Sequence, residues 1–216
     1  MLGEPIKKKA SEILARLANP VRMIVFAQEG ECPFCKEAVG LAQEVTGLSD
    51  KLSVEVYDLK KDGPKAVEYR VDKTPGFVIA GDRDYGIRFY GVPAGFEFST
   101  LLGLVELVGG RNGGLRPETR TKLASLASQV DIQMFVTLTC PVCPVAAVGA
   151  ARFALESDRV SVSVIDATEF QQLADLYNVM AVPRTVLNRG HAFEGLLPEE
   201  KLVDEITGSA VSLAIP

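Results

Sequence analysis

Hydrophobic and polar residues in the first half of the chain switch between the two-residue period of strands and the 3.6-residue period of helices. Four segments have the apolar runs or the alternation of strands, at residues 23–26, 52–57, 77–79 and 87–90. Helical periods are found at residues 33–46, 63–70 and from about 98 onward. The predicted order is therefore βαβαββα, preceded by one further helix at about residues 6–18.

The second half of the chain repeats this order. Its strands are predicted at residues 132–137, 160–165, 185–187 and 192–194. Its helices are predicted to begin at Glu118, Pro141, Glu169 and Pro198. An early βαβ crossover followed by a hairpin implies a mixed sheet with helices on both faces. We therefore expect an α/β fold of two tandem units, each a mixed four-stranded sheet flanked by helices, with an extra N-terminal helix.

The cysteines carry the clearest sign of duplication. They form two C-x-x-C pairs, Cys32 with Cys35 and Cys140 with Cys143, which are 108 residues apart in a chain of 216. When residues 51–79 are compared with the segment 108 positions later, 9 of 29 residues are identical without a gap. Average residue usage would give roughly 2. So long a period indicates a duplicated domain, because solenoids repeat every ~20 to 50 residues.

A glycine-rich stretch at residues 109–114 separates the two halves, and Pro117 opens the next helical pattern. We place the boundary near residue 114. The first unit is predicted to span residues 1–114 and to carry the sequence Cys-Pro-Phe-Cys. The second is predicted to span residues 115–216 and to carry Cys-Pro-Val-Cys.

Composition and charge exclude several classes of protein. Hydrophobic residues make up 47% of the chain and charged residues 24%, with a net charge of −5, which is typical of a globular protein and not of a disordered one. The acidic balance disfavours nucleic-acid binding by counterion release. No apolar run reaches the ~18 residues of a membrane span. No secretory signal is visible at the N-terminus, so we expect a cytoplasmic location.

The chain has a single histidine, His191, and no tryptophan. A multi-histidine metal site is therefore impossible, and a Ser-His-Asp or Cys-His triad would have to use that one residue. We expect His191 to be an exposed turn residue. The four cysteines are then the best candidates for the chemistry.

In both pairs the first cysteine follows a predicted strand and precedes a proline, which suits the first position of a helix. The sequence therefore places Cys32 and Cys140 at helix N-caps, before Pro33 and Pro141. Backbone amides and the positive end of the helix dipole favour a thiolate there. A free cysteine titrates near ~8.5, and such a position lowers its pKa to ~3.5 to 7.5.

The second cysteine of each pair, Cys35 or Cys143, is expected one turn further along the helix. From there it can attack a mixed disulfide and release the substrate. Phe34 and Val142 lie between the cysteines and tune the reduction potential, which spans ~−270 to −120 mV in such motifs. The direction of electron transfer cannot be deduced from so wide a range.

The residues that flank the two pairs differ. Glu31 and Lys36 flank the first pair, and Lys36 is a candidate to assist the thiolate, although an exposed helical lysine is usually just solvated. Thr139 and Pro144 flank the second pair. Pro144 is expected to be the fourth helical residue and to forfeit the first helix bond. The two sites are therefore predicted to differ in potential.

Two further features match across the repeat. Thr74-Pro75 and Val182-Pro183 each stand just before a predicted strand. Proline there suits an edge or a cis bond beside a site, and the preceding residue can then pair with an extended substrate peptide. The same spacing also relates two tyrosines and two aspartates, which we interpret as core and turn residues: Tyr69 and Tyr177, Asp58 and Asp166.

Taken together, C-P-x-C at a helix start, the βαβαββα order and an x-Pro before the third strand resemble the thioredoxin/glutaredoxin superfamily. The tandem arrangement is similar to the protein disulfide oxidoreductases of thermophilic archaea and bacteria, also called glutaredoxin-like proteins. Residues 89–98 and 177–183 are similar to that family at matching positions. The resemblance covers nearly the whole chain.

This resemblance implies dithiol-disulfide exchange on protein substrates, with reductase, oxidase and isomerase activities. It implies cis bonds at Pro75 and Pro183, attack by Cys32 and Cys140, and resolution by the second cysteine of each pair. It implies no bound cofactor, with reducing equivalents delivered from NADPH by a flavin-containing, thioredoxin-reductase-like enzyme. Thioredoxins carry a buried aspartate six residues before the attacking cysteine, whereas this chain has Phe26 and Met134 there. A glutaredoxin-like mode is therefore the better analogy.

Two alternatives remain open. The protein could be an electron-relay reductase that feeds a peroxiredoxin. The four cysteines could instead form a non-enzymatic zinc-binding module, although zinc ribbons usually separate their pairs by ~15 to 20 residues. Disulfides that only staple the fold are disfavoured, because so short a loop removes little chain entropy.

Overall fold

The computed structural model describes residues 2–212, and these form sixteen helices and strands. The strands are β1 (Val21–Ala27), β2 (Leu52–Asp58), β3 (Gly76–Ala80), β4 (Asp84–Tyr90), β5 (Val130–Val136), β6 (Val160–Asp166), β7 (Arg184–Leu187) and β8 (His191–Glu194). The helices are α1 (Glu4–Leu14), α2 (Cys35–Thr46), α3 (Gly63–Glu68), α4 (Glu97–Gly110), α5 (Pro117–Ala124), α6 (Cys143–Glu156), α7 (Gln171–Leu176) and α8 (Glu199–Ser212). The expected order βαβαββα is confirmed in both halves.

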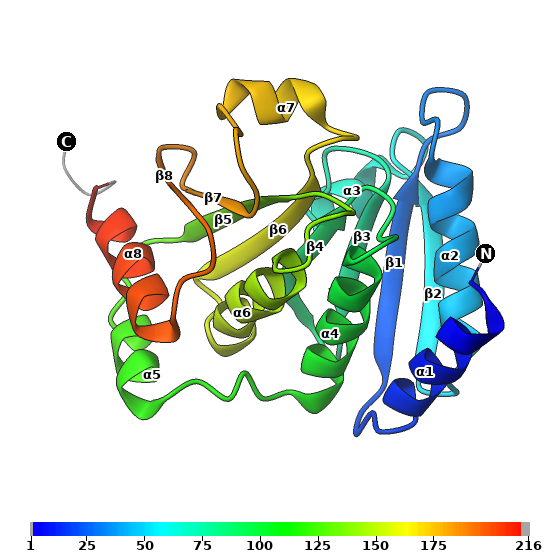
Figure 1. Cartoon of the computed structure of the whole chain (residues 1–216), viewed down its shortest axis with the longest axis horizontal. Coiled ribbons are helices and arrows are strands. Elements are labelled where there is room, and N and C mark those ends of the chain that lie inside the picture. Colours follow the sequence, from blue (N-terminus) through cyan, green and yellow to red (C-terminus); the bar gives the residue numbers. More distant parts are fainter. Residues whose placement is uncertain (1, 213–216) are drawn as a thin grey trace.

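The two four-stranded sheets are joined into one. The strand order is β2-β1-β3-β4-β6-β5-β7-β8, so each half contributes four neighbouring strands (Figure 1). The junction is a parallel pairing of β4 with β6, from Ile87 opposite Val162 to Tyr90 opposite Ile165. The continuous sheet was not predictable from the sequence, because backbone pairing between two edge strands leaves no motif in their side chains.

The strand directions place the two cysteine pairs on the same side of the sheet, at the C-terminal ends of its strands β1 and β5. The strand β1 is antiparallel to β3, β3 is antiparallel to β4, β4 is parallel to β6, and β6 is parallel to β5. Strands β1, β4 and β5 therefore point the same way. The helices α2, α4 and α6 therefore all begin on the same side of the sheet, at the C-terminal ends of these strands.

Helices cover both faces of the sheet. The larger core lies on the face covered by α1, α2, α4, α6 and α8, and contains Leu101, Ala147 and Ile206 with no exposed surface. The smaller core lies on the other face, under α3 and α7, around Phe26 and Phe135. This is the mixed sheet with helices on both sides that the sequence predicts.

Helices α4 and α6 pack closely because α4 carries a glycine at the contact. A Cβ atom on Gly103 would lie 2.6 Å from Cγ2 of Val148. Two parallel helices from different halves of the chain are thus held side by side above the junction of the sheets.

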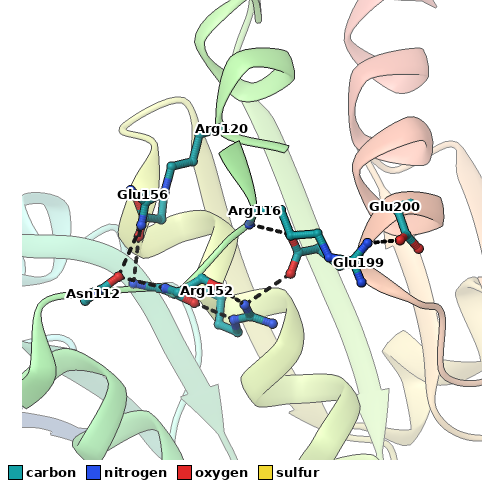
Figure 2. A network of polar contacts seen from close by, with 9 residues as sticks. Asn112, Arg116, Arg120, Arg152, Glu156, Glu199 and Glu200 are labelled. Atoms are coloured by element: carbon teal, nitrogen blue, oxygen red, sulfur yellow. Dashed lines mark hydrogen bonds and ion pairs between the residues drawn. The ribbon is translucent and has the colours of Figure 1, made fainter. Parts of the chain in front are cut away.

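The segment between α4 and α5 is fixed by polar contacts to α6 and α8 (Figure 2). The Gly113 amide donates to Glu156 at 2.7 Å, and the Arg116 amide donates to Glu199 at 2.8 Å. The Arg152 guanidinium binds the carbonyl oxygens of Gly113 and Gly114. These contacts hold the second half of the chain to the segment that leads into it, while the boundary at residue 114 stays a prediction.

Between residues 2 and 212, none of the helices has the length and apolar character needed to span a bilayer.

Candidate active site

Both C-x-x-C pairs are disulfides in the structure. The Cα atoms of Cys32 and Cys35 are 5.4 Å apart, and those of Cys140 and Cys143 are 5.5 Å apart. Each pair lies in the turn that leads from the central strand of its unit into the following helix. The two sites therefore occupy equivalent places in the duplicated fold.

The helices begin later than the sequence predicts. Regular helix starts at Cys35 and Cys143, and the residues at the N-caps are Phe34 and Val142. Cys32 therefore precedes the cap by two residues, in a turn closed by the Cys35 amide on the Cys32 carbonyl at 3.4 Å. The expected N-cap position of the first cysteines is wrong, but the disulfide still holds their sulfurs next to the helix start.

Pro144 is consequently the second helical residue and not the fourth. Amides in the first turn have no intrahelical acceptor, so a proline there costs no helix bond. It does remove one amide donor from the end of α6, whereas Lys36 keeps that donor at the equivalent place in α2. The second site can therefore offer one fewer N–H group to a thiolate than the first.

The first cysteines differ in exposure. Cys32 is half-buried, whereas Cys140 is 7% exposed. The second cysteines are both buried, at 6% for Cys35 and with no exposed surface for Cys143. In both pairs the second cysteine is the less exposed one, as attack by the first and resolution by the second require.

The two x-Pro bonds have the cis form that the resemblance implies, and the second x-Pro segment lies next to a disulfide. The bonds Thr74-Pro75 and Val182-Pro183 are both cis, and both prolines are buried. The Val182 carbonyl oxygen lies 3.9 Å from the Cys140 sulfur. In the reduced protein a thiol at this place could donate to that oxygen.

The residues predicted to tune the sites lie around the disulfides on the surface. Phe34 is 48% exposed and Val142 is 47% exposed. The side chains of Pro33, Pro141 and Lys36 are also exposed. Their effect on the potentials remains a prediction.

Charged side chains crowd the loop beside the first disulfide. Lys60 pairs with Glu31 at 2.7 Å, and Lys61 pairs with Glu29 at 2.9 Å. The Lys60 ammonium group lowers the pKa of Glu31. Asp58 accepts hydrogen bonds from the amides of Lys60 and Lys61, so its predicted turn role agrees with the structure.

The first residue of α4 carries a buried carboxyl group that the sequence analysis missed. Glu97 is the first residue of α4 and has no exposed surface. Six residues on, Gly103 meets Val148, which is five residues after Cys143. Since both helices rise about 1.5 Å per residue in the same direction, Glu97 lies level with the start of α6.

The environment of Glu97 favours a protonated carboxyl. Its Oε2 atom accepts from the Thr100 hydroxyl at 2.8 Å, while Oε1 is buried without a partner among the described residues. Burial, together with a smaller effect of the nearby Asp166 carboxylate, raises the pKa of Glu97 to about 7, although the hydrogen bond from Thr100 lowers it. The first unit thus supplies a titratable group to the helix start of the second. A glutamate between Phe96 and Phe98 at the head of an apolar helix was the available signal.

Asp166 and Glu169 extend this group of carboxyls. Asp166 ends β6 with 1% exposure, and burial raises its pKa. Glu169 accepts a hydrogen bond from the Val92 amide at 2.6 Å, and burial raises its pKa too. Asp166 also accepts from the Thr168 amide at 2.9 Å, which confirms its turn role.

The two tyrosines matched across the repeat contribute to the core as predicted, and the single histidine departs slightly from its predicted place. Tyr69 is 5% exposed and belongs to the core, and Tyr177 packs against the same core. His191 begins β8 instead of standing in a turn, and its Nε2 lies 2.6 Å from Glu205 on the surface.

The two disulfides lie on the same side of the sheet but are well separated across its strands. Four strand intervals lie between β1 and β5, which at ~4.8 Å each amount to about 19 Å. The four sulfurs therefore cannot converge on a single ion, and the alternative of one four-cysteine zinc site does not fit this arrangement.

Comparison with known proteins agrees with this architecture. The family model described as a thioredoxin domain matches residues 130–208. The crystal structure of a protein disulfide oxidoreductase from Aeropyrum pernix K1 matches with a TM-score of 0.91 and 29% identity, over 98% of this chain and 95% of that chain. An N-terminal domain of alkylhydroperoxide reductase AhpF from Enterococcus faecalis has the same fold, with a TM-score of 0.88 and 23% identity over 95% of this chain and 100% of that chain.

Among curated proteins, one component of the alkyl hydroperoxide reductase of Pseudomonas aeruginosa is 26% identical over 213 residues. The match covers 97% of this chain and 38% of that protein. The chain therefore spans about two fifths of the length of this relative. The resemblance drawn from the sequence is confirmed at the level of the fold: the chain is similar over nearly its whole length to a protein disulfide oxidoreductase, and it carries two C-x-x-C disulfides.

Proposed function

We propose that the protein catalyses dithiol-disulfide exchange on protein substrates at both sites. The observation that carries this proposal is the repeated occurrence, in both units, of a C-x-x-C disulfide at a helix start and of a buried cis-proline before the third strand. The more accessible cysteine comes first in each pair, which suits attack on a large substrate.

The reaction at the first site balances as follows. The Cys32 thiolate attacks one sulfur of a substrate disulfide, that disulfide breaks, and the other substrate sulfur leaves as a thiolate. Cys35 then loses its proton and attacks Cys32 in the mixed disulfide, which releases the second substrate thiolate. The substrate gains two electrons and the protein ends as the disulfide seen in the structure. Oxidation of a substrate dithiol is the same sequence in reverse.

At the second site Cys140 attacks and Cys143 resolves, and Glu97, level with the start of α6, is the candidate to take up the proton of the resolving thiol. A resolving thiol must be deprotonated before it attacks, and a carboxyl with a pKa of about 7 can accept that proton near neutral pH. We infer that Glu97 does so for Cys143. Among the described residues, α1, which precedes the first site, carries no buried acidic side chain, so the two sites would differ in mechanism as well as in potential.

The x-Pro segments serve as the substrate-binding surface in this proposal. Thr74 and Val182 precede the cis-prolines, and the Val182 carbonyl oxygen lies 3.9 Å from the Cys140 sulfur. An extended substrate segment could pair with their backbone as an added strand. Pro75 and Pro183 would hold that backbone in place.

A second candidate function is an electron relay that ends on a peroxiredoxin. It is favoured by the similarity of nearly the whole chain to part of an alkyl hydroperoxide reductase component. In both functions no organic cofactor is bound by this chain, and NADPH would supply electrons through a flavin-containing reductase. The protein substrates, this reductase and a peroxiredoxin are the proposed partners, and a cytoplasmic location would suit all of them.

The two functions are separable by assay. We expect the protein with dithiothreitol to reduce insulin, and each site to do so after the other is replaced by Cys32→Ser with Cys35→Ser or by Cys140→Ser with Cys143→Ser. Repair of scrambled ribonuclease would support isomerase activity. Rapid peroxide turnover with NADPH, a thioredoxin reductase and a peroxiredoxin, without insulin reduction, would favour the relay instead.

A further inference from the structure

A groove runs along the first turns of the helix that follows each disulfide. In the second unit it lies between α6 and residues 196–198 and has a volume of about 660 Å³. In the first unit it lies between α2 and residues 92–95 and has a volume of about 850 Å³. The grooves are equivalent, because their helix residues correspond at the 108-residue shift of the repeat.

Polar contacts cross the far end of each groove. In the second groove Arg152 pairs with Glu199 at 3.1 Å (Figure 2). In the first groove Glu44 holds the equivalent place and binds the Leu2 amide at 2.9 Å and the Lys7 ammonium group at 3.1 Å. These contacts lie nine residues beyond the second cysteine, or about 13 Å along the helix. Each groove therefore meets its disulfide at the opposite end, which we call the mouth.

The mouths differ in chemistry. Lys36 and Glu37 follow the second cysteine at the first mouth, and both are exposed. Pro144 and Val145 hold the equivalent places at the second mouth, where Val145 is 61% exposed. The two charged side chains at the mouth of the first groove thus correspond to two aliphatic side chains at the mouth of the second groove.

The aliphatic mouth belongs to a larger apolar surface around the second disulfide. Val142 lies between the cysteines and is 47% exposed, and Leu196 on the opposite wall of the groove is 50% exposed. Exposed apolar side chains gathered in one place mark binding surfaces in proteins that are otherwise polar outside.

We propose that this repeated groove receives a side chain of the substrate next to its target cysteine, and that Val145 makes the second site selective for aliphatic residues there while Glu37 removes that selectivity at the first site. The proposal rests on the proposed function, because a mixed disulfide on Cys140 must bring the substrate chain to the mouth of the second groove. The occupant is therefore an aliphatic side chain of the substrate polypeptide.

The test uses full-length proteins with one active pair, in which the other pair is replaced by serine. Each protein is reduced and then mixed, in a single turnover, with either of two synthetic peptides that contain one internal disulfide. The peptides differ in having leucine or glutamate next to the attacked cysteine. We expect the second-site protein to reduce the leucine peptide about 10-fold faster, since an apolar pocket discriminates to roughly that extent.

Exchanging the mouth residues should exchange the selectivity. Val145→Glu in the second-site protein is expected to bring the two rates within about twofold, and Glu37→Val in the first-site protein to create a preference for leucine of about fivefold. Val67→Glu is the matched control, because Val67 is 79% exposed on α3 and lies outside both grooves. It should leave both ratios unchanged.

The outcomes separate this proposal from the proposed function. An unchanged ratio in Val145→Glu, or an equal change in Val67→Glu, overturns the groove assignment while reduction itself continues. Folded proteins that reduce neither peptide and no insulin would overturn the proposed function, and the groove assignment with it.

Discussion

The Glu169 carboxylate of the second unit accepts a hydrogen bond from the Val92 amide of the first unit, with 2.6 Å between Oε1 and the amide nitrogen. Its other oxygen, Oε2, is buried without a partner among the described residues. The bond fixes the start of the segment that leads from β4 to Glu97. The same segment is held at its other end, where the Phe96 amide donates to the Leu138 carbonyl at 2.9 Å. Contacts between the units therefore position the segment that carries a buried carboxyl to the second site.

Two substitutions of Glu169 should distinguish the contribution of its hydrogen bond to stability from the contribution of its buried charge. We expect Glu169→Leu to lower the free energy of unfolding by about 1–3 kcal/mol, because the Val92 amide loses its acceptor. Glu169→Gln keeps an acceptor oxygen and removes a buried charge, so it should be less destabilising. Urea unfolding at neutral pH measures both, and equal losses in the two variants would contradict the role of the hydrogen bond.

The buried carboxyls should make the protein less stable as the pH rises. Burial raises the pKa of Glu97 from its ordinary value of 4.5 to about 7. Between these values the folded protein binds more protons than the unfolded chain, so the free energy of unfolding falls with increasing pH. We expect Glu97 to account for at most about 3 kcal/mol of this fall. In Glu97→Gln the dependence on pH should be visibly flatter, and an unchanged dependence would contradict the assignment.

Glu97 should also shape the pH dependence of catalysis at the second site alone. In the protein that lacks Cys32 and Cys35, we expect Glu97→Gln to slow substrate release from the mixed disulfide by about 100-fold and to remove an inflection near its pKa. The protein that lacks Cys140 and Cys143 serves as the control, since Glu97→Gln should leave its pH profile unchanged. Equal effects in both proteins would indicate a structural role.

The two disulfides should differ in reduction potential. The first site retains the amide of Lys36, whereas Pro144 removes that donor from the second site. The first thiolate is therefore the better stabilised, and a stabilised reduced form raises the potential. We expect Cys32–Cys35 to be the more oxidising pair by about 30 mV, which corresponds to about 1.4 kcal/mol. Equilibration of each single-site protein with glutathione tests this, and the opposite order would contradict it.

The contact of α4 with α6 should tolerate no larger side chain on α4. Gly103→Leu would collide with Val148, and we expect the free energy of unfolding to fall by about 1–3 kcal/mol. Gly208→Ala on α8 is the matched control, because nothing lies within 4 Å of the added atom. That change should stabilise the protein by about 0.5–1 kcal/mol. Thermal or urea unfolding measures both variants.

The sequence predicted the repeat, the element order and the four cysteines, because these depend on local periodicity and on spacing. It misplaced the helix start at both sites, since a proline after the cysteine also fits the turn that the Cys35 amide closes. The pairing of β4 with β6 and the burial of Glu97 depend on tertiary contacts between the two halves of the chain. The strand pairing leaves no pattern in a single sequence, and the burial of Glu97 leaves only the place of this residue between Phe96 and Phe98.

The identity of the attacking sulfurs is the most direct test of this account. Replacing both resolving cysteines, by Cys35→Ser with Cys143→Ser, should leave substrate trapped as a mixed disulfide. Mass spectrometry of the protein after reaction with a disulfide substrate is predicted to find the adducts on Cys32 and Cys140. A reciprocal variant, Cys32→Ser with Cys140→Ser, should trap little. Adducts of equal yield in the reciprocal variant, or none in the first, would contradict the central claim.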